Sequence, residues 1–131
     1  MPAGPKRHTI LIIEDNPNNA RLMLRVLERA NRYRLLLAED GENGLTMALN
    51  ERPDLILLDL GLPDVDGQTV AAMLKQPGGL PHTPVVVVTA WPTETARQMV
   101  TAYGCEGYIP KPIDTRAFAE QVAAYLHANL P

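Results

Sequence analysis

Five polar or charged residues stand where continuously apolar segments of the sequence end: Glu14, Asp15, Asp59, Thr89 and Lys111. If these segments are strands of one open parallel sheet, the five side chains share a pocket, because ligands bind at the carboxyl ends of such strands. Three carboxylates, one hydroxyl and one ammonium group are suited to the chemistry of phosphate and Mg²⁺.

Mg²⁺ prefers oxygen ligands, keeps several waters and is typically held by one or two carboxylates and a phosphate oxygen. Asp15 and Asp59 can supply those carboxylates, with Glu14 acting through water. A carboxylate can also attack a phosphoryl group and form an aspartyl phosphate. Because phosphoryl transfer needs mainly positioning and charge neutralisation, a metal on one side with Lys111 and the Thr89 hydroxyl on the other would suffice. Asp59 is then the expected acceptor.

Each of these residues also has an ordinary structural explanation. Glu14 and Asp15 can be polar residues before a helix cap, Thr89 is a good strand residue, and Lys111 is a common surface type. Asp59 is harder to explain in this way, because it follows four apolar residues and precedes a turn-forming stretch. The joint placement of all five favours the phosphate chemistry.

Three segments are apolar at every position, which predicts strands that are buried on both faces: 10–13, 55–58 and 85–88. Two further strands are expected at 35–38 and 107–109, the latter at an edge because its apolar length is short. The Pro- and Gly-rich stretch 76–84 predicts a loop at the end of the sheet away from the pocket.

Helical segments alternate with these strands, at about 17–30, 43–50 and 66–75. A fourth helix contains the apolar spacing Ala96, Met99, Val100 and Tyr103, and a last one contains Phe118, Val122 and Tyr125 or Leu126. Asn16 is the expected N-cap of the first helix and Asp114 that of the last. The buried stripe of the first helix is expected to be Ala20, Met23, Leu24 and Leu27. Right-handed crossovers between parallel strands then give an α/β doubly wound sheet with helices on both faces.

The composition predicts one domain, 1–131, with a core at about 8–129. With 12 Lys and Arg against 15 Asp and Glu, the formal net charge is −3, which argues against a nucleic-acid or anionic-membrane surface. No apolar run approaches the ~20 residues that span a bilayer, and residues 1–7 lack a signal-peptide core. The single cysteine, Cys105, has no activating pattern around it, is expected to be a packed residue, and is compatible with a reducing cytoplasm.

Four motifs occur in order along the chain: Glu14-Asp15-Asn16; the run 53–60 with Leu62-Pro63 and Asp66-Gly67; Thr89-Ala90; and Gly107-Tyr108-Ile109-Pro110-Lys111-Pro112. Together they closely resemble the receiver domain of two-component response regulators. Each motif alone is weak, but the ordered set is specific and covers the chain from about 8 to 129.

The resemblance implies a flavodoxin-like, five-stranded parallel sheet of order 2-1-3-4-5. It also implies Mg²⁺-dependent transfer of phosphate from a histidine to Asp59. Carried over by position, Asp15, Asp59 and the main-chain carbonyl of Gly61 would bind Mg²⁺, with Glu14 in the outer shell.

The same resemblance assigns a switch to Thr89 and Tyr108, whose hydroxyl and ring would respond to the phosphate. Lys111 would bind a phosphate oxygen, and its bond to Pro112 would be cis. Two positions that vary in this family lie close by. Gly61 brings no side chain to the site, whereas Trp91, after Ala90, brings a large ring to the same opening or is a partly exposed loop aromatic.

As for partners, the resemblance implies a sensor histidine kinase or a histidine phosphotransfer protein, and a downstream protein target. We expect a stand-alone receiver that relays phosphate or signals by protein binding, most similar to cell-division regulators and to receivers of hybrid histidine kinases. Leu22 lies off the apolar stripe of the first helix, so it is expected to face solvent and, with Asn19, to dock the kinase or phosphotransfer protein.

Three alternatives stay open. A Mg²⁺-dependent phosphatase of the haloacid dehalogenase type also uses an aspartyl phosphate, but it carries a second acid where this chain has Gly61. A flavin or nucleotide carrier has the same topology, yet no Gly-rich phosphate loop follows the first strand. The chain can also be a receiver fragment of a longer regulator or hybrid kinase.

Overall fold

The computed structural model describes residues 7–128, in which five parallel strands form one sheet. The order across the sheet is β2-β1-β3-β4-β5, as the resemblance implied. The strands are β1 (His8–Ile13), β2 (Tyr33–Ala38), β3 (Leu55–Leu58), β4 (Val85–Thr89) and β5 (Gly107–Pro110).

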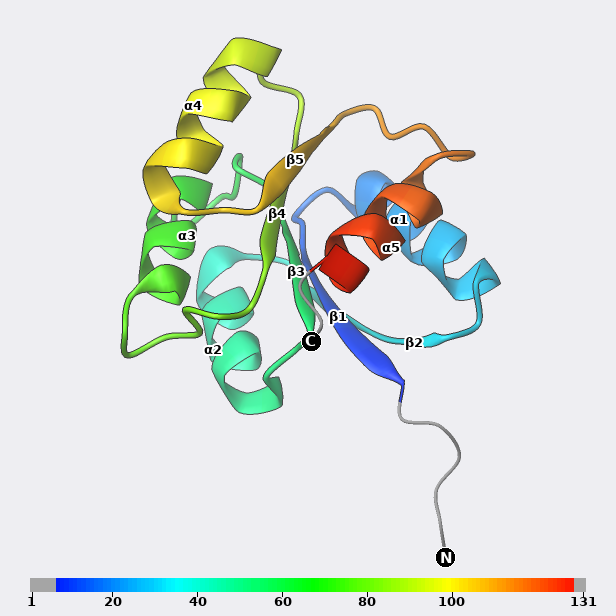
Figure 1. Ribbon diagram of the computed structural model, residues 1–131, viewed down its shortest axis with the longest axis horizontal. Helices are drawn as coiled ribbons and strands as arrows, with labels where there is room; N and C mark the ends of the chain where they lie inside the picture. Colours follow the sequence, from blue (N-terminus) through cyan, green and yellow to red (C-terminus); the bar gives the residue numbers. More distant parts are fainter. Residues whose placement is uncertain (1–6, 129–131) are drawn as a thin grey trace, which may run out of the picture.

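Five helices connect and follow the strands: α1 (Pro17–Arg29), α2 (Gly41–Glu51), α3 (Gly67–Lys75), α4 (Thr93–Tyr103) and α5 (Phe118–Ala128). Figure 1 shows α1 and α5 on one face of the sheet and α2, α3 and α4 on the other. This three-layer arrangement confirms the predicted α/β doubly wound fold. No helix among residues 7–128 is long and apolar enough to cross a membrane.

The core has two parts, one on each face of the sheet. Ile10 and Ile12 of β1 pack toward α1 and α5, whereas Leu11 and Ile13 pack toward the other three helices. All four side chains are completely buried, as are those of β3. A strand buried on both faces has to be apolar at every position, which is the pattern of the sequence. Full burial of each such side chain contributes roughly 1.5–3 kcal/mol.

The start of α1 agrees with the prediction. The Asn16 side chain accepts hydrogen bonds from the N–H groups of Asn18 and Asn19, at 2.9 and 3.1 Å, and Pro17 occupies the first helical position. The buried face differs by one residue, because Val26 is buried and Leu24 is only half-buried. The helix is therefore rotated slightly, so that Val26 packs with the part of the core below α1 and α5.

Other helix ends depart from the prediction. The helix α2 begins two residues early, at Gly41, because the Asp40 side chain accepts the N–H of Asn43 at 2.7 Å. The expected cap of the last helix, Asp114, instead accepts the N–H of Arg116 at 2.9 Å in a turn that precedes α5. Asp114 thus shapes the approach to α5, four residues before its first helical residue, Phe118.

Candidate functional site

The candidate site lies where β1 and β3 end side by side. Ile13 pairs with Leu58 in the register of these strands, so the residues that follow them emerge together. The N–H of Asp59 donates to the carbonyl of Ile13 at 3.0 Å, which holds the two strand ends in contact. Glu14, Asp15 and Asp59 each place a carboxylate oxygen within 4.8 Å of the others. The structure therefore brings the three predicted carboxylates into one cluster.

Lys111 enters this cluster from β5. Its Nζ lies 2.5 Å from Oε1 of Glu14 and 3.1 Å from Oδ1 of Asp59. Its backbone N–H donates to the carbonyl of Thr89 at 2.8 Å, which ties the end of β5 to the end of β4. The Lys111–Pro112 peptide bond is cis, as the resemblance implied.

The surroundings of Lys111 correct one expectation. We expected it to be an exposed strand-end residue, but its side chain is only 13% exposed. The reason is that the ammonium folds back over the ends of β1 and β3 to reach the two carboxylates. Lys111 therefore has a structural role as well as its expected chemical one.

Glu14 is the most buried member of the cluster, with 1% of its surface exposed. Burial raises the pKa of its carboxyl above the ordinary value, and the charge of Asp59 adds to this rise. The bond to Lys111 and the N–H of Asn16, 3.2 Å from Oε2, act in the opposite direction. The charge of the Glu14 carboxyl thus depends on its neighbours, and its side chain is more deeply buried than those of Asp15 and Asp59.

The donor set fits a hard divalent cation such as Mg²⁺. All three side chains offer oxygen atoms, and they range from the buried Glu14 through the partly buried Asp59 to the exposed Asp15. Such a gradient leaves one side of the cluster open to water, and Mg²⁺ usually keeps several waters. Since Oε1 of Glu14 is occupied by Lys111, Asp15 and Asp59 are better placed to bind a metal directly.

The loop after Asp59 is held close to its side chain. The N–H of Gly61 donates to Oδ1 of Asp59 at 3.3 Å, and a Cβ atom at Gly61 would lie 3.9 Å from Oδ2. A side chain at this position would therefore stand directly beside the candidate acceptor.

Packing explains the glycine of the Asp66-Gly67 motif, because a Cβ atom at Gly67 would come within 2.5 Å of the Cα of Leu60. Only glycine lets α3 begin this close to the loop.

Thr89 ends β4 and is almost fully buried, at 2% exposure. Its Oγ1 accepts a hydrogen bond from the N–H of Trp91 at 3.0 Å, across the exposed Ala90. Trp91 and Tyr108 are both half-buried and pack against the core on the α2, α3 and α4 side. Trp91 is therefore a partly exposed loop aromatic that is anchored next to the hydroxyl of the candidate switch residue.

Leu22 does not face solvent as fully as expected. It is half-buried and, with Asn19 and Met23, lines a small pocket that is closed by Lys111, Pro112 and Ile113. The reason is that the segment after β5 lies against the outer side of α1. The residues predicted to dock a partner thus lie next to the residue that reaches Asp59.

Asp64 is a site-positioning residue that the sequence analysis missed. Its Oδ1 and Oδ2 accept the N–H groups of Gly41 and Glu42, at 2.8 and 3.0 Å, and so tie the loop after Asp59 to the start of α2. These two N–H groups hold the pKa of Asp64 below its ordinary value. A turn at Pro63-Asp64 is visible in the sequence, but its partners lie more than twenty residues away.

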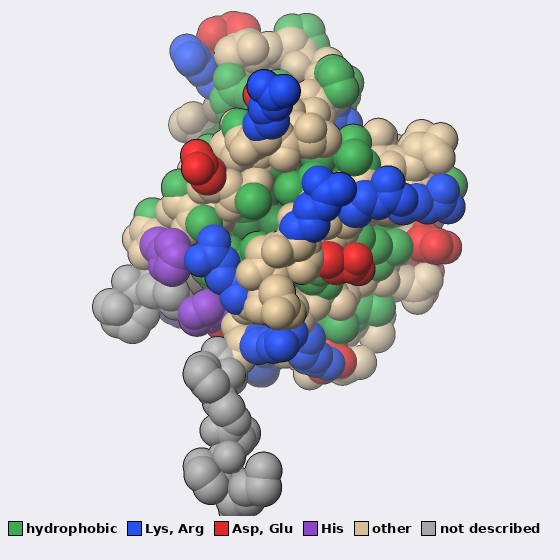
Figure 2. Space-filling view, turned by 90° about the vertical axis from the view of Figure 1, so that its right-hand side faces the viewer, with side chains coloured by type: hydrophobic (Ala, Val, Ile, Leu, Met, Phe, Trp, Pro, Cys, Tyr) green, Lys and Arg blue, Asp and Glu red, His purple; other side chains and the backbone are tan. Residues whose placement is uncertain are grey.

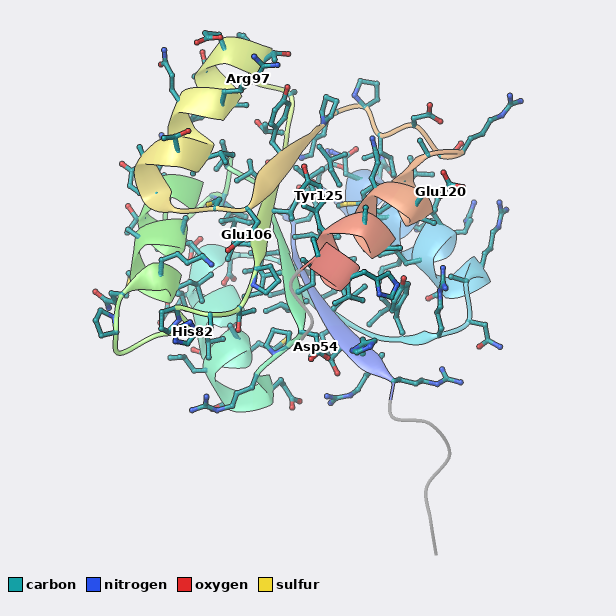
Figure 3. All side chains as sticks on the ribbon, in the orientation of Figure 1. Asp54, His82, Arg97, Glu106, Glu120 and Tyr125 are labelled. Atoms are coloured by element: carbon teal, nitrogen blue, oxygen red, sulfur yellow. The ribbon has the colours of Figure 1, made fainter. Side chains whose placement is uncertain are left out.

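Cys105 behaves as predicted, as a packed residue. Burial, with a smaller contribution from the charge of Glu106, raises the pKa of its thiol to about 11. Lys75 and Glu106 form an ion pair next to it, 2.8 Å apart, at the end of the sheet away from the acidic cluster. Figure 3 shows Glu106 at the start of β5, on this far side of the sheet.

Comparison with known proteins bears on two of the three open alternatives, the phosphatase and the carrier. Residues 10–123 match the family described as the response regulator receiver domain. The chain belongs to this family. Family membership disfavours the phosphatase and carrier alternatives, in agreement with the order of the motifs.

Two individual response regulators are similar to this chain over most of its length. The polar-differentiation response regulator DivK of Brucella anthropi is 38% identical over 118 residues, which cover 90% of this chain and 95% of that protein. A putative response regulator from Chloroflexus aurantiacus is 28% identical, with a TM-score of 0.86 over 93% of this chain and 99% of the other. The first similarity agrees with the expected likeness to cell-division regulators.

A third relative was solved with its phosphate. The phosphorylated cyanobacterial phytochrome response regulator RcpA is 29% identical, with a TM-score of 0.76 over 91% of each chain. The fold described above is therefore one that a phosphorylated response regulator adopts.

Proposed function

We propose that this receiver accepts a phosphoryl group on Asp59 from a phosphohistidine and signals by binding proteins in its phosphorylated state. One observation carries the proposal. The Lys111 ammonium lies 3.1 Å from Oδ1 of Asp59, inside a cluster that holds two further carboxylates within 4.8 Å. A carboxylate surrounded in this way can act as a nucleophile once a cation neutralises the incoming phosphate.

In the transfer, an oxygen of Asp59 attacks phosphorus, the P–N bond to the donor histidine breaks, and the electron pair leaves with the imidazole. Lys111 stabilises the charge on the phosphoryl oxygens, because an ammonium 3.1 Å from the nucleophile lies within reach of them. Asp15, Asp59 and the carbonyl of Gly61 would hold Mg²⁺, with Glu14 in the outer shell. When bound, Mg²⁺ supplies further charge neutralisation at the phosphoryl group.

The response to phosphorylation is assigned to Thr89 and Tyr108. The Thr89 oxygen already accepts the N–H of Trp91, so its hydroxyl proton is the group that can be donated to a phosphate oxygen. Movement of Thr89 would change the packing of Trp91 and Tyr108, which lie half-buried on the same side of the sheet. This change in surface is what a downstream protein would recognise.

The donor is a sensor histidine kinase or a histidine phosphotransfer protein, docked at Asn19 and Leu22 next to the active site. The protein acts in the cytoplasm as a single receiver domain, 1–131, that relays phosphate or signals by protein binding. It does not turn over a separate substrate, since the only reactions proposed are gain and loss of its own phosphate. The net charge of −3 is compatible with a protein target and argues against nucleic acid as a partner.

The experiment is incubation with phosphoramidate, a small donor with the same P–N bond as phosphohistidine, followed by intact-mass spectrometry. The wild type should gain one phosphoryl group with Mg²⁺ and none after metal removal. Asp59→Asn should gain none under either condition. Equal labelling of wild type and variant would overturn the assignment.

A further inference from the structure

A cavity lies at the opposite end of the sheet from the acidic cluster, where β1 and β2 begin and α5 ends. Its volume is about 380 Å³, within the ~300–1,000 Å³ range of small-molecule sites. The residues that line it are Arg7, His8, Asn31, Arg32, Tyr33, Leu126 and His127. Nothing in the proposed phosphotransfer uses this cavity.

The lining of the cavity is rich in basic side chains. The lining residues named above include two arginines and two histidines but no carboxylate. In Figure 2, histidine side chains lie beside Lys or Arg side chains on the lower part of the face that carries α1 and α5. Asp54 is an acid outside the lining; its Oδ2 lies 3.7 Å from Nδ1 of His8 and accepts the N–H of Thr9 at 2.7 Å. Figure 3 shows Asp54 at this end of the sheet.

Tyr33 supplies an independent observation. Only 7% of its surface is exposed, and its buried hydroxyl has no hydrogen-bond partner among the described residues. A buried tyrosine hydroxyl usually finds a partner, because an unmet hydrogen bond costs free energy. The Arg32 guanidinium carbon lies 5.6 Å from the centre of the Tyr33 ring, a cation–π distance that holds the guanidinium beside the cavity.

A simpler explanation covers only part of this arrangement. Basic residues near the C-terminal end of a helix stabilise its dipole, and His127 is in the last turn of α5. Arg7 and Arg32 are outside the helices, however, and a helix dipole does not account for the hydroxyl of Tyr33. The group as a whole is better explained by a ligand that is an anion and a hydrogen-bond acceptor.

We propose that this cavity binds a small, soluble, phosphate-bearing molecule. Guanidinium groups match phosphate oxygens in pairs, so Arg7 and Arg32 would take the phosphate. The Tyr33 hydroxyl would donate to the same group, and the histidine rings would supply further N–H donors. The site is separate from Asp59, so its ligand and the aspartyl phosphate can be present together.

The test is titration of inorganic pyrophosphate, without Mg²⁺, into the full-length ¹⁵N-labelled protein, followed by NMR. The expected result is saturable shifts of the backbone amides of Arg32, Tyr33 and His127. Arg32→Gln should weaken binding by about tenfold, the equivalent of ~1.4 kcal/mol, and Tyr33→Phe should weaken it as well. Arg34→Gln is the matched control, because Arg34 is on the same strand but pairs with Glu51 at 3.1 Å, away from the cavity.

Thermal unfolding without ligand separates binding from structure. Tyr33→Phe removes only a hydroxyl that has no hydrogen-bond partner within residues 7–128, so the melting temperature should stay the same or rise. Three results would overturn the proposal: shifts that do not saturate, the same weakening in Arg34→Gln as in Arg32→Gln, or a lower melting temperature of the Tyr33→Phe protein. The last would show that the hydroxyl serves the fold.

Discussion

The Lys111 ammonium lies 3.1 Å from Oδ1 of Asp59, and the same nitrogen lies 2.5 Å from Oε1 of the buried Glu14. One cation thus serves two carboxylates, while the third acid, Asp15, is exposed beside them. Three acids with a single ammonium leave the cluster net negative. A divalent cation would balance the negative charge of the cluster.

Mg²⁺ should stabilise the folded protein, because a ligand that binds only the folded state adds RT ln(1 + [L]/Kd) to the free energy of unfolding. At about 100 times Kd the gain is ~2.7 kcal/mol. Thermal unfolding with and without Mg²⁺ measures it. Asp15→Asn should lose most of the shift, whereas Glu120→Gln, which changes an exposed acid on α5, should keep it; an equal shift in the two variants would contradict the site.

Lys111→Ala should lower the free energy of unfolding, because it leaves Glu14 buried without its cation. Breaking a buried ion pair in this way costs roughly 3–5 kcal/mol. Adding Glu14→Gln to Lys111→Ala should recover part of the loss, since the remaining side chain is then neutral. Urea unfolding of the two single variants and the double variant measures the coupling. Strictly additive losses would show that the pair does not stabilise the fold.

Asp64→Ala should destabilise the protein at neutral pH, because it removes the carboxylate that accepts the N–H groups of Gly41 and Glu42. The pKa of Asp64 is lowered in the folded state, so its contribution is present above the ordinary value of 3.8 and is lost as pH falls through the lowered pKa. The difference in urea midpoint between wild type and variant should therefore shrink in acid. A difference that does not change with pH would exclude the ionised carboxylate as its cause.

Leu22→Ala should weaken docking of the phosphodonor protein by more than about 1 kcal/mol, as expected for an interface anchor. Phosphorylation by phosphoramidate should be unaffected, because the small donor does not need the surface of α1. The measurement is the rate of transfer from the donor protein below saturation. Leu49→Ala is the control, since Leu49 is an exposed leucine, at 45%, on α2. Equal rates for the two variants would remove Leu22 from the interface.

The fold was predictable because its strands are simple to read. Segments such as Leu55–Leu58 are short and apolar at every position, which is typical of a strand covered on both faces, and the polar residue Asp59 marks the end of this one. The acidic cluster was predicted from the residues at these strand ends, because the ends of neighbouring parallel strands lie at the same edge of the sheet. The buried face of α1 was harder to predict, because Val26 and Leu24 are both apolar and only packing decides which of them is buried.

The contacts that could not be predicted join residues far apart in the chain. The shared pocket of Lys111 and Glu14 was predicted, but the burial of Lys111 was not, because nothing in its own neighbourhood shows that its Nζ lies 2.5 Å from Oε1 of Glu14. The hydrogen bonds that Asp64 accepts from the start of α2 were missed for the same reason, because they join residues 23 positions apart. Local patterns determine where an element begins or ends, whereas such contacts depend on how several elements come together.

The central claim is that Asp59 is the phosphoacceptor, and mapping of the phosphorylated position tests it most directly. Borohydride converts an acyl phosphate on aspartate into homoserine, which peptide mass spectrometry locates in the sequence. After phosphorylation with Mg²⁺, homoserine should be found at position 59 and not at Asp15, and the product expected from a glutamyl phosphate, hydroxynorvaline, should not be found at Glu14. Conversion at one of those acids, with position 59 still aspartate, would contradict the account.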